Sequence, residues 1–137
     1  AEIFIQNNII AATDVTGFGL ARHAQNLALR IGLTGCIIDL QLVPLLHGVK
    51  PLFEAGITSS LHKQNQHAVT IGKSENFDDS TQGPLFDPQT SGGLLGVFRA
   101  IDADNAINAL TKTGHRAAMI GRLDQQTAGI TIASGDL

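Results

Sequence analysis

The chain has 137 residues, of which 43% are hydrophobic and 15% are charged, and its formal net charge is −3. This length and apolar fraction suit one folded domain with a hydrophobic core. The acidic balance and the absence of Trp and Tyr argue against a nucleic-acid surface, which needs excess basic charge and aromatic stacking platforms. No apolar run approaches the roughly 18 residues of a membrane span, and the first residues show no signal-peptide pattern. We therefore expect a cytoplasmic protein that contacts neither membrane nor nucleic acid.

Strands and helices are predicted to alternate along the chain. The clearest helix covers residues 20–31, where apolar residues recur at helical spacing and Gly32 favours a stop. Two further helices are expected over 44–55 and 102–113. The stretch 72–83 is polar without a period and predicts a surface loop. Strands are predicted at 8–13, 35–40, 94–98, 117–123 and 129–133. This order indicates an α/β (α+β) fold, with a mixed β-sheet flanked by helices.

Cysteine and histidine usage limits the available chemistry. Cys36 is the single cysteine, which excludes an internal disulfide and a multi-cysteine zinc site. It lies in an apolar strand, so we expect a small buried hydrophobe and not a nucleophile. The histidines are scattered and are expected to be solvated or to cap helices. They are His23, His47, His62, His67 and His115.

A first glycine segment, Thr13-Asp14-Val15-Thr16-Gly17-Phe18-Gly19-Leu20, lies where a strand passes into a helix. A glycine turn lets the backbone approach a ligand, and a helix N-terminus offers free N–H groups to phosphate. Asp14 adds a hard oxygen ligand of the kind Mg²⁺ prefers. Alternatively, Asp14 or Thr16 only caps the helix. The segment lacks the Gly-Lys-Ser/Thr ending of a P-loop. The predicted phosphate-side residues are Thr13, Thr16, Gly17 and Gly19.

A second glycine segment covers residues 85–95 and reads Leu-Phe-Asp-Pro-Gln-Thr-Ser-Gly-Gly-Leu-Leu. Its Asp-Pro pair favours a turn, and two consecutive glycines remove both Cβ atoms just before a predicted buried strand. Such a loop could cradle an anion with its amides, hold a neighbouring loop in place, or serve only as a turn. Its candidate site residues are Asp87, Gln89, Thr90, Ser91, Gly92 and Gly93.

Together the two glycine segments resemble the C-terminal domain of the selenophosphate synthetase (selenide, water dikinase) family. Residues 42–49, Leu-Val-Pro-Leu-Leu-His-Gly-Val, look like that family's Pro-Leu-Leu-x-Gly stretch, and residues 114–121 look like its closing Gly-…-Ala-…-Ile-Gly strand. The resemblance runs through essentially the whole chain in the right order. The fold it implies is that of the C-terminal domain in the aminoimidazole ribonucleotide synthetase superfamily.

The resemblance implies a specific activity. The family makes selenophosphate from selenide, ATP and water, releasing AMP and orthophosphate, and Mg²⁺ holds the phosphates. The family's magnesium-binding aspartate maps onto Asp14. Residues 1–137 would form a single domain, the C-terminal part of a two-domain enzyme. The catalytic cysteine or selenocysteine, a lysine and most ATP contacts belong to the N-terminal domain, so no catalytic residue is expected here. The isolated domain would be inactive, and the full-length enzyme could be a homodimer.

Residues 57–65 depart from the glycine- and arginine-bearing stretch expected in many family members. They look more like versions of the synthetase that are fused behind a pyridine-nucleotide oxidoreductase. Two other functions also stay open. One is a non-catalytic binding or regulatory module of the same fold within a fusion protein. The other is a related ATP-dependent synthetase that binds another phosphorylated substrate, such as a purine ribonucleotide precursor.

Overall fold

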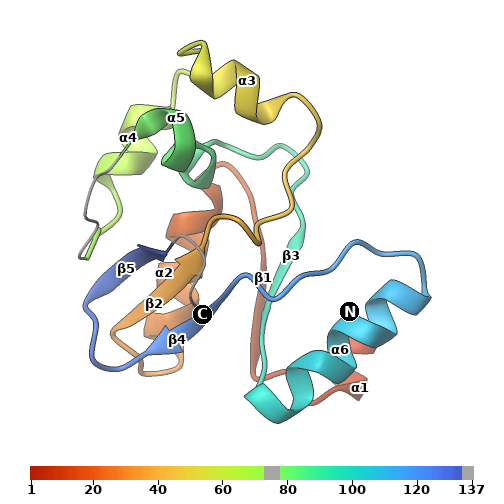
Figure 1. The fold of residues 1–137 in the computed structure, drawn as a ribbon. Coiled ribbons are helices and arrows are strands. Elements are labelled where there is room, and N and C mark those ends of the chain that lie inside the picture. The colour runs from red at the N-terminus through yellow and green to blue at the C-terminus, as the bar shows by residue number, and fades with distance from the viewer. Residues whose placement is uncertain (73–77, 134–137) are drawn as a thin grey trace.

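The computed structural model describes residues 1–72 and 78–133 (Figure 1). The helices are α1 (Glu2–Gln6), α2 (Gly19–Arg30), α3 (Val49–Glu54), α4 (His62–His67), α5 (Asp79–Gln82), the 3₁₀ turn η1 (Gly83–Phe86) and α6 (Ala100–Lys112). The strands are β1 (Ala11–Asp14), β2 (Gly35–Asp39), β3 (Leu94–Val97), β4 (Gly121–Asp124) and β5 (Gly129–Ala133). Among the described residues, every helix is too short or too polar to cross a lipid bilayer.

The strands form two sheets. In the first, β1 pairs antiparallel with β3, and Asp14 lies opposite Leu94. In the second, β2 is central, antiparallel to β4 and parallel to β5. The α/β (α+β) class is confirmed, and the three-stranded sheet is mixed as predicted. The strands that carry the two glycine segments lie in a separate small sheet.

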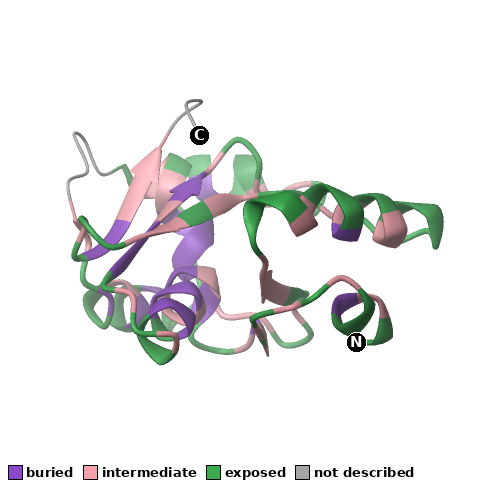
Figure 2. Ribbon diagram, turned by 90° about the horizontal axis from the view of Figure 1, so that it is seen from below, coloured by how far each residue is buried: buried purple, intermediate pink, exposed green. Residues whose placement is uncertain are grey.

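The core lies between α2 and the three-stranded sheet. Buried residues concentrate on these elements (Figure 2). Seen in Figure 1, α3, α4 and α5 gather at one end of the domain, and α1 lies beside α6 at another. The main cluster joins small residues of α2 to apolar residues of the sheet and η1. It contains Ala21, Ala24, Cys36, Ile38, Val69, Leu85, Phe86 and Ile130.

The sequence pattern of α2 explains why this helix forms and where it ends. Ala24, Leu27 and Ala28 are buried on one face, as the helical spacing predicted. The backbone at Gly32 takes a positive φ of 80°, and the Leu33 N–H donates to the Ala28 carbonyl at 3.0 Å. This termination needs a left-handed residue, for which glycine is favoured. The predicted helix and its stop are confirmed.

Several predicted elements differ from the structure. The first strand begins at Ala11 instead of residue 8, and the helix expected over 44–55 forms only over Val49–Glu54. The predicted loop 72–83 is wrong at its end, because α5 and η1 are helical. Asp78 starts α5 by accepting a hydrogen bond from the Ser80 N–H at 3.0 Å, a capping contact made across two residues. Residues 73–77 of that predicted loop lie outside the described residues.

Candidate functional site

The two glycine segments lie side by side. The Val15 N–H donates to the Gly93 carbonyl at 3.0 Å, directly beyond the β1–β3 pairing. One turn further, the Gln89 N–H donates to the Thr16 carbonyl at 3.2 Å. Segments more than 70 residues apart in sequence therefore form one continuous surface through backbone hydrogen bonds.

Asp14 is the last residue of β1, and its side chain is exposed. Within residues 1–72 and 78–133 its carboxylate has no hydrogen bond or ion pair. Leu94, directly opposite in the register, is also exposed, so both side chains share the open face of the small sheet. The carboxylate is thus free to bind a group that approaches from solvent.

The alternative that Asp14 or Thr16 only caps α2 is wrong. The residue at the N-cap of α2 is Phe18, and no side chain in the described part of the chain caps the helix. Thr16 instead contacts His23, whose Nε2 lies 3.1 Å from both the backbone nitrogen and the Oγ1 of Thr16. Because the backbone N–H can only donate, Nε2 of His23 is the acceptor in this contact. His23 therefore fixes the turn before α2.

Close backbone packing explains two of the predicted glycines. A Cβ on Gly92 would lie on the Val15 carbonyl oxygen, far inside van der Waals contact. Gly19 has a φ of 76°, and a Cβ there would be 2.8 Å from the carbonyl carbon of Phe86. By contrast, Gly17 and Gly93 have open space where a Cβ would be. Gly92 and Gly19 are required for the two segments to meet, whereas Gly17 and Gly93 leave backbone accessible.

The remaining predicted residues lie around the place where the two glycine segments meet, which we call the junction. The Thr13 hydroxyl donates to the Asp14 carbonyl at 3.1 Å. The Gln89 side-chain amide donates to the Asp87 carbonyl at 3.2 Å, which tightens the turn. Thr90 and Ser91 are exposed next to Gly92. Asp87 is half-buried and borders a hollow of about 290 Å³ against α3.

Two side chains that the sequence pattern did not single out hold the junction. Asn65 on α4 is 5% exposed, and its Nδ2 donates to the Gly17 carbonyl at 2.9 Å and to the Phe86 carbonyl at 3.0 Å. His23 could have been found, because helical side chains point towards the helix N-terminus and His23 follows the turn by about one helical turn. Asn65 lies 48 residues from Gly17, and no local pattern indicates its contact.

The donors present suit a partial metal site. Among the described residues, no three histidine, cysteine or carboxylate side chains cluster so that they could hold a metal ion. Mg²⁺ is commonly bound through only one or two carboxylates together with phosphate oxygens and water. Asp14 fits that requirement as a single ligand, and further ligands would have to come from a phosphate and from outside this domain.

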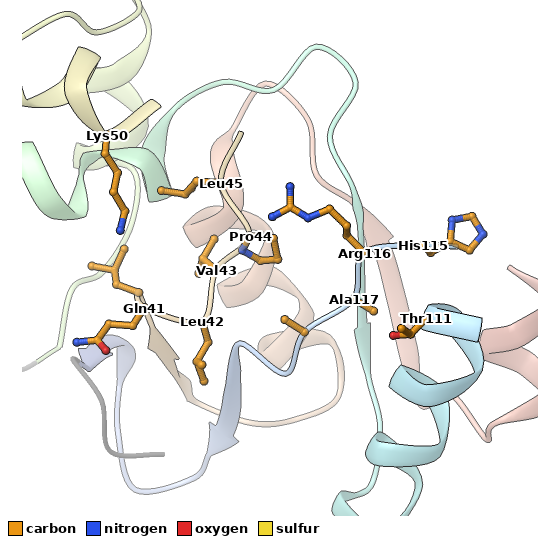
Figure 3. Close-up of a pocket in the computed structure, with 12 residues that line it drawn as sticks. Gln41, Leu42, Val43, Pro44, Leu45, Lys50, Thr111, His115, Arg116 and Ala117 are labelled. Carbon is orange, nitrogen blue, oxygen red and sulfur yellow. The ribbon is translucent and has the colours of Figure 1, made fainter. Parts of the chain in front are cut away.

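A hollow between the 40–45 and 115–118 stretches is separate from the glycine segments. It has a volume of about 570 Å³. Figure 3 shows Lys50 and Arg116 pointing into this space and His115 pointing away from it. None of the predicted site residues lines it. The predicted site residues therefore lie outside this hollow.

Comparison with known proteins identifies the family of the chain. Residues 1–133 match the family described as "AIR synthase related protein, C-terminal domain". The chain belongs to this family. A protein of Geobacter sp. (strain M21) named "Selenide, water dikinase" is 38% identical over 125 residues, which cover 90% of this chain and 36% of that protein. One of the same name from Myxococcus xanthus (strain DK1622) is 34% identical over 135 residues, covering 96% and 38%. The chain thus spans little more than a third of the length of these relatives, and the resemblance to selenide, water dikinase is confirmed.

In this AIR synthase related domain, the burial expected for Cys36 is confirmed, and the solvated or capping role expected for His62 is wrong. Cys36 is a free, buried thiol in β2. His62 is fully buried, with its ring between Phe53 and Phe86 and its Nε2 3.4 Å from Asp79 Oδ1. Asp79 also accepts from Lys63, and this contact holds the pKa of the Asp79 carboxyl below its usual value. The sequence did not predict this packing because α4 shows too little apolar periodicity to be recognised.

The thiol of Cys36 is expected to react slowly while the domain is folded. Burial raises its pKa to about 11, and the thiolate is the reactive form. At pH 8, a thiol-specific chromogenic reagent should label Cys36 at least about 100-fold more slowly in the native domain than in urea, because both thiolate fraction and access fall. Quantifying Cys36 labelling by mass spectrometry checks this. Equal rates in native and unfolded protein would contradict it.

Proposed function

We propose that this chain is the C-terminal domain of a selenide, water dikinase and that its two glycine segments form one wall of the nucleotide site. The observation that carries the proposal is the exposed Asp14 carboxylate beside the Gly92–Gly93 turn, which pairs with none of the residues that the structure describes. A carboxylate next to accessible backbone suits a Mg²⁺-bound phosphate. The names of the relatives support the same activity.

The reaction would convert selenide, ATP and water to selenophosphate, AMP and orthophosphate. When bound, Mg²⁺ would neutralise charge that develops on the phosphoryl oxygens. Asp14 would hold that ion, and the accessible backbone at Gly17 and Gly93 would let phosphate oxygens approach closely. Thr13, Thr16, Thr90 and Ser91 carry hydroxyls that can donate to the same oxygens. The nucleophile and most contacts to ATP would belong to an N-terminal domain, so the isolated domain would be inactive.

We further propose a cytoplasmic enzyme that works as a homodimer in its full-length form. A fused oxidoreductase domain is also consistent with residues 57–65. Neither feature is needed for the role proposed for Asp14.

The activity is tested by incubating the full-length protein with ATP, Mg²⁺ and selenide without oxygen and following phosphorus-31 NMR. We expect selenophosphate, AMP and orthophosphate to appear in equal amounts, only when selenide and Mg²⁺ are both present. The isolated domain of residues 1–137 should show none of these products. A full-length protein that binds nucleotide but forms no AMP would instead support the non-catalytic module, and turnover with a purine ribonucleotide precursor would support the related synthetase.

A further inference from the structure

The buried side chain of Asn65 joins the two glycine segments through hydrogen bonds. Asn65 lies on α4, and its Nδ2 donates to the Gly17 carbonyl at 2.9 Å and to the Phe86 carbonyl at 3.0 Å. A side-chain amide has two N–H groups in a fixed plane. Both are used here, one for each segment, so the amide acts as a rigid spacer between them.

The positions of the two carbonyls show which parts of the segments Asn65 joins. Gly17 is in the turn that follows Asp14, and Phe86 directly precedes Asp87. Among the described residues, the segments are also joined by the β1–β3 pairing and, beyond it, by the backbone hydrogen bonds Val15 to Gly93 and Gln89 to Thr16. These two bonds join the segments near the small sheet, whereas Asn65 joins them at the end nearest α2 and η1. The junction is therefore held at both ends, and a side chain, Asn65, holds the end nearest α2 and η1.

We propose that Asn65 is a positioning residue for the phosphate site, setting the distance between the Asp14–Gly17 turn and the Asp87–Gly93 loop. The inference rests on the proposed function for its catalytic consequence, but its structural part does not. Asn65 makes no hydrogen bond to Asp14, the predicted metal ligand, and it binds Gly17 through the carbonyl oxygen, so it acts through the carbonyls it holds. A misplacement of about 1 Å in a phosphoryl-transfer site can lower the rate by roughly 100-fold.

The test uses the full-length protein with Asn65→Ala and Asn65→Asp. Alanine removes both donors, and aspartate keeps the size of the side chain while an ionised carboxylate faces two carbonyl oxygens. Gln64→Ala is the matched control, because Gln64 is the exposed neighbour on the same helix. We expect a fall in kcat/KM for Mg–ATP of about 10- to 100-fold in both Asn65 variants, and a higher Mg²⁺ concentration for half-maximal rate. Gln64→Ala should keep wild-type values.

Hydrogen exchange gives a readout that does not depend on activity. In the Asn65 variants, the hydrogen-bonded amides of Thr16 and Gln89 should exchange at least about 10-fold faster than in the wild type, while β2 amides stay protected. If Asn65→Ala does not fold, the test uses Asn65→Asp, because the aspartate side chain fills the same volume as asparagine. An Asn65 variant that exchanges like the wild type at both segments overturns the proposal, as does one with unchanged kcat/KM and unchanged Mg²⁺ dependence. If the wild type makes no selenophosphate, the proposed function fails, and the exchange result alone decides the role of Asn65.

Discussion

Replacing Asp14 with asparagine in the full-length protein is expected to lower selenide-dependent AMP formation by about 100-fold or more. Asparagine keeps the shape of the side chain but removes its negative charge, so the Mg²⁺ ion loses a carboxylate ligand. Loss of groups that only support a metal ligand typically costs roughly 10- to 100-fold, and a direct ligand should cost at least as much. The measurement is the rate of AMP release as a function of Mg²⁺ concentration.

The fold should not change in this variant. The Asp14 carboxylate is exposed and has no hydrogen bond or ion pair to any described residue, and surface substitutions of this kind usually change stability by less than about 0.5 kcal/mol. Asp104→Asn is the matched control, because Asp104 is an exposed carboxylate on α6, away from the glycine segments. Wild-type activity in Asp14→Asn, with wild-type Mg²⁺ dependence, would remove Asp14 from the site.

The sequence predicted the residues of the junction because local chemistry marks them. Glycines, Asp-Pro and hydroxyl residues pack poorly in a hydrophobic core. A run of them between apolar elements therefore indicates a turn that is also a candidate ligand-binding loop. Asp14 and Gly92 were found in this way. Their proximity did not follow from the pattern, because the pairing of β1 with β3 is a contact between distant parts of the chain.

What the sequence did not predict depends on tertiary burial. The α4 segment, His62–His67, contains no apolar residue, so hydrophobic periodicity gives no helix signal there. Its buried residues, His62 and Asn65, are polar, and their burial follows from contacts with Phe53, Phe86 and Asp79 and with the carbonyls that Asn65 binds. Polar residues are buried where such partners exist, and the partners of Asn65 lie 21 and 48 residues away.

Adding a methyl group at Gly19 is expected to destabilise the domain much more than adding one at Gly17. Gly19→Ala meets two penalties: a positive φ of 76°, and a Cβ 2.8 Å from the Phe86 carbonyl carbon. Left-handed backbone costs a non-glycine residue about 1–2 kcal/mol, and overpacking costs about 1–3 kcal/mol. The sum, about 2–5 kcal/mol, is a large part of the roughly 5–15 kcal/mol that stabilises a typical domain. Thermal unfolding of the two variants, measured side by side, gives the comparison.

Gly92 and Gly93 provide the same comparison in the second segment. Gly92→Ala forces its Cβ onto the Val15 carbonyl oxygen, whereas Gly93→Ala enters open space and neither position requires a positive φ. We therefore expect Gly92→Ala to cost about 1–3 kcal/mol and Gly93→Ala to cost less than about 1 kcal/mol. Equal destabilisation within each pair would contradict the close approach of the two segments.

If Gly17→Ala and Gly93→Ala fold normally but lose activity, the open space at these glycines is used by a ligand, since their methyl groups have no contact within the described residues. The four variants therefore separate the glycines that let the segments pack from those that leave room for phosphate.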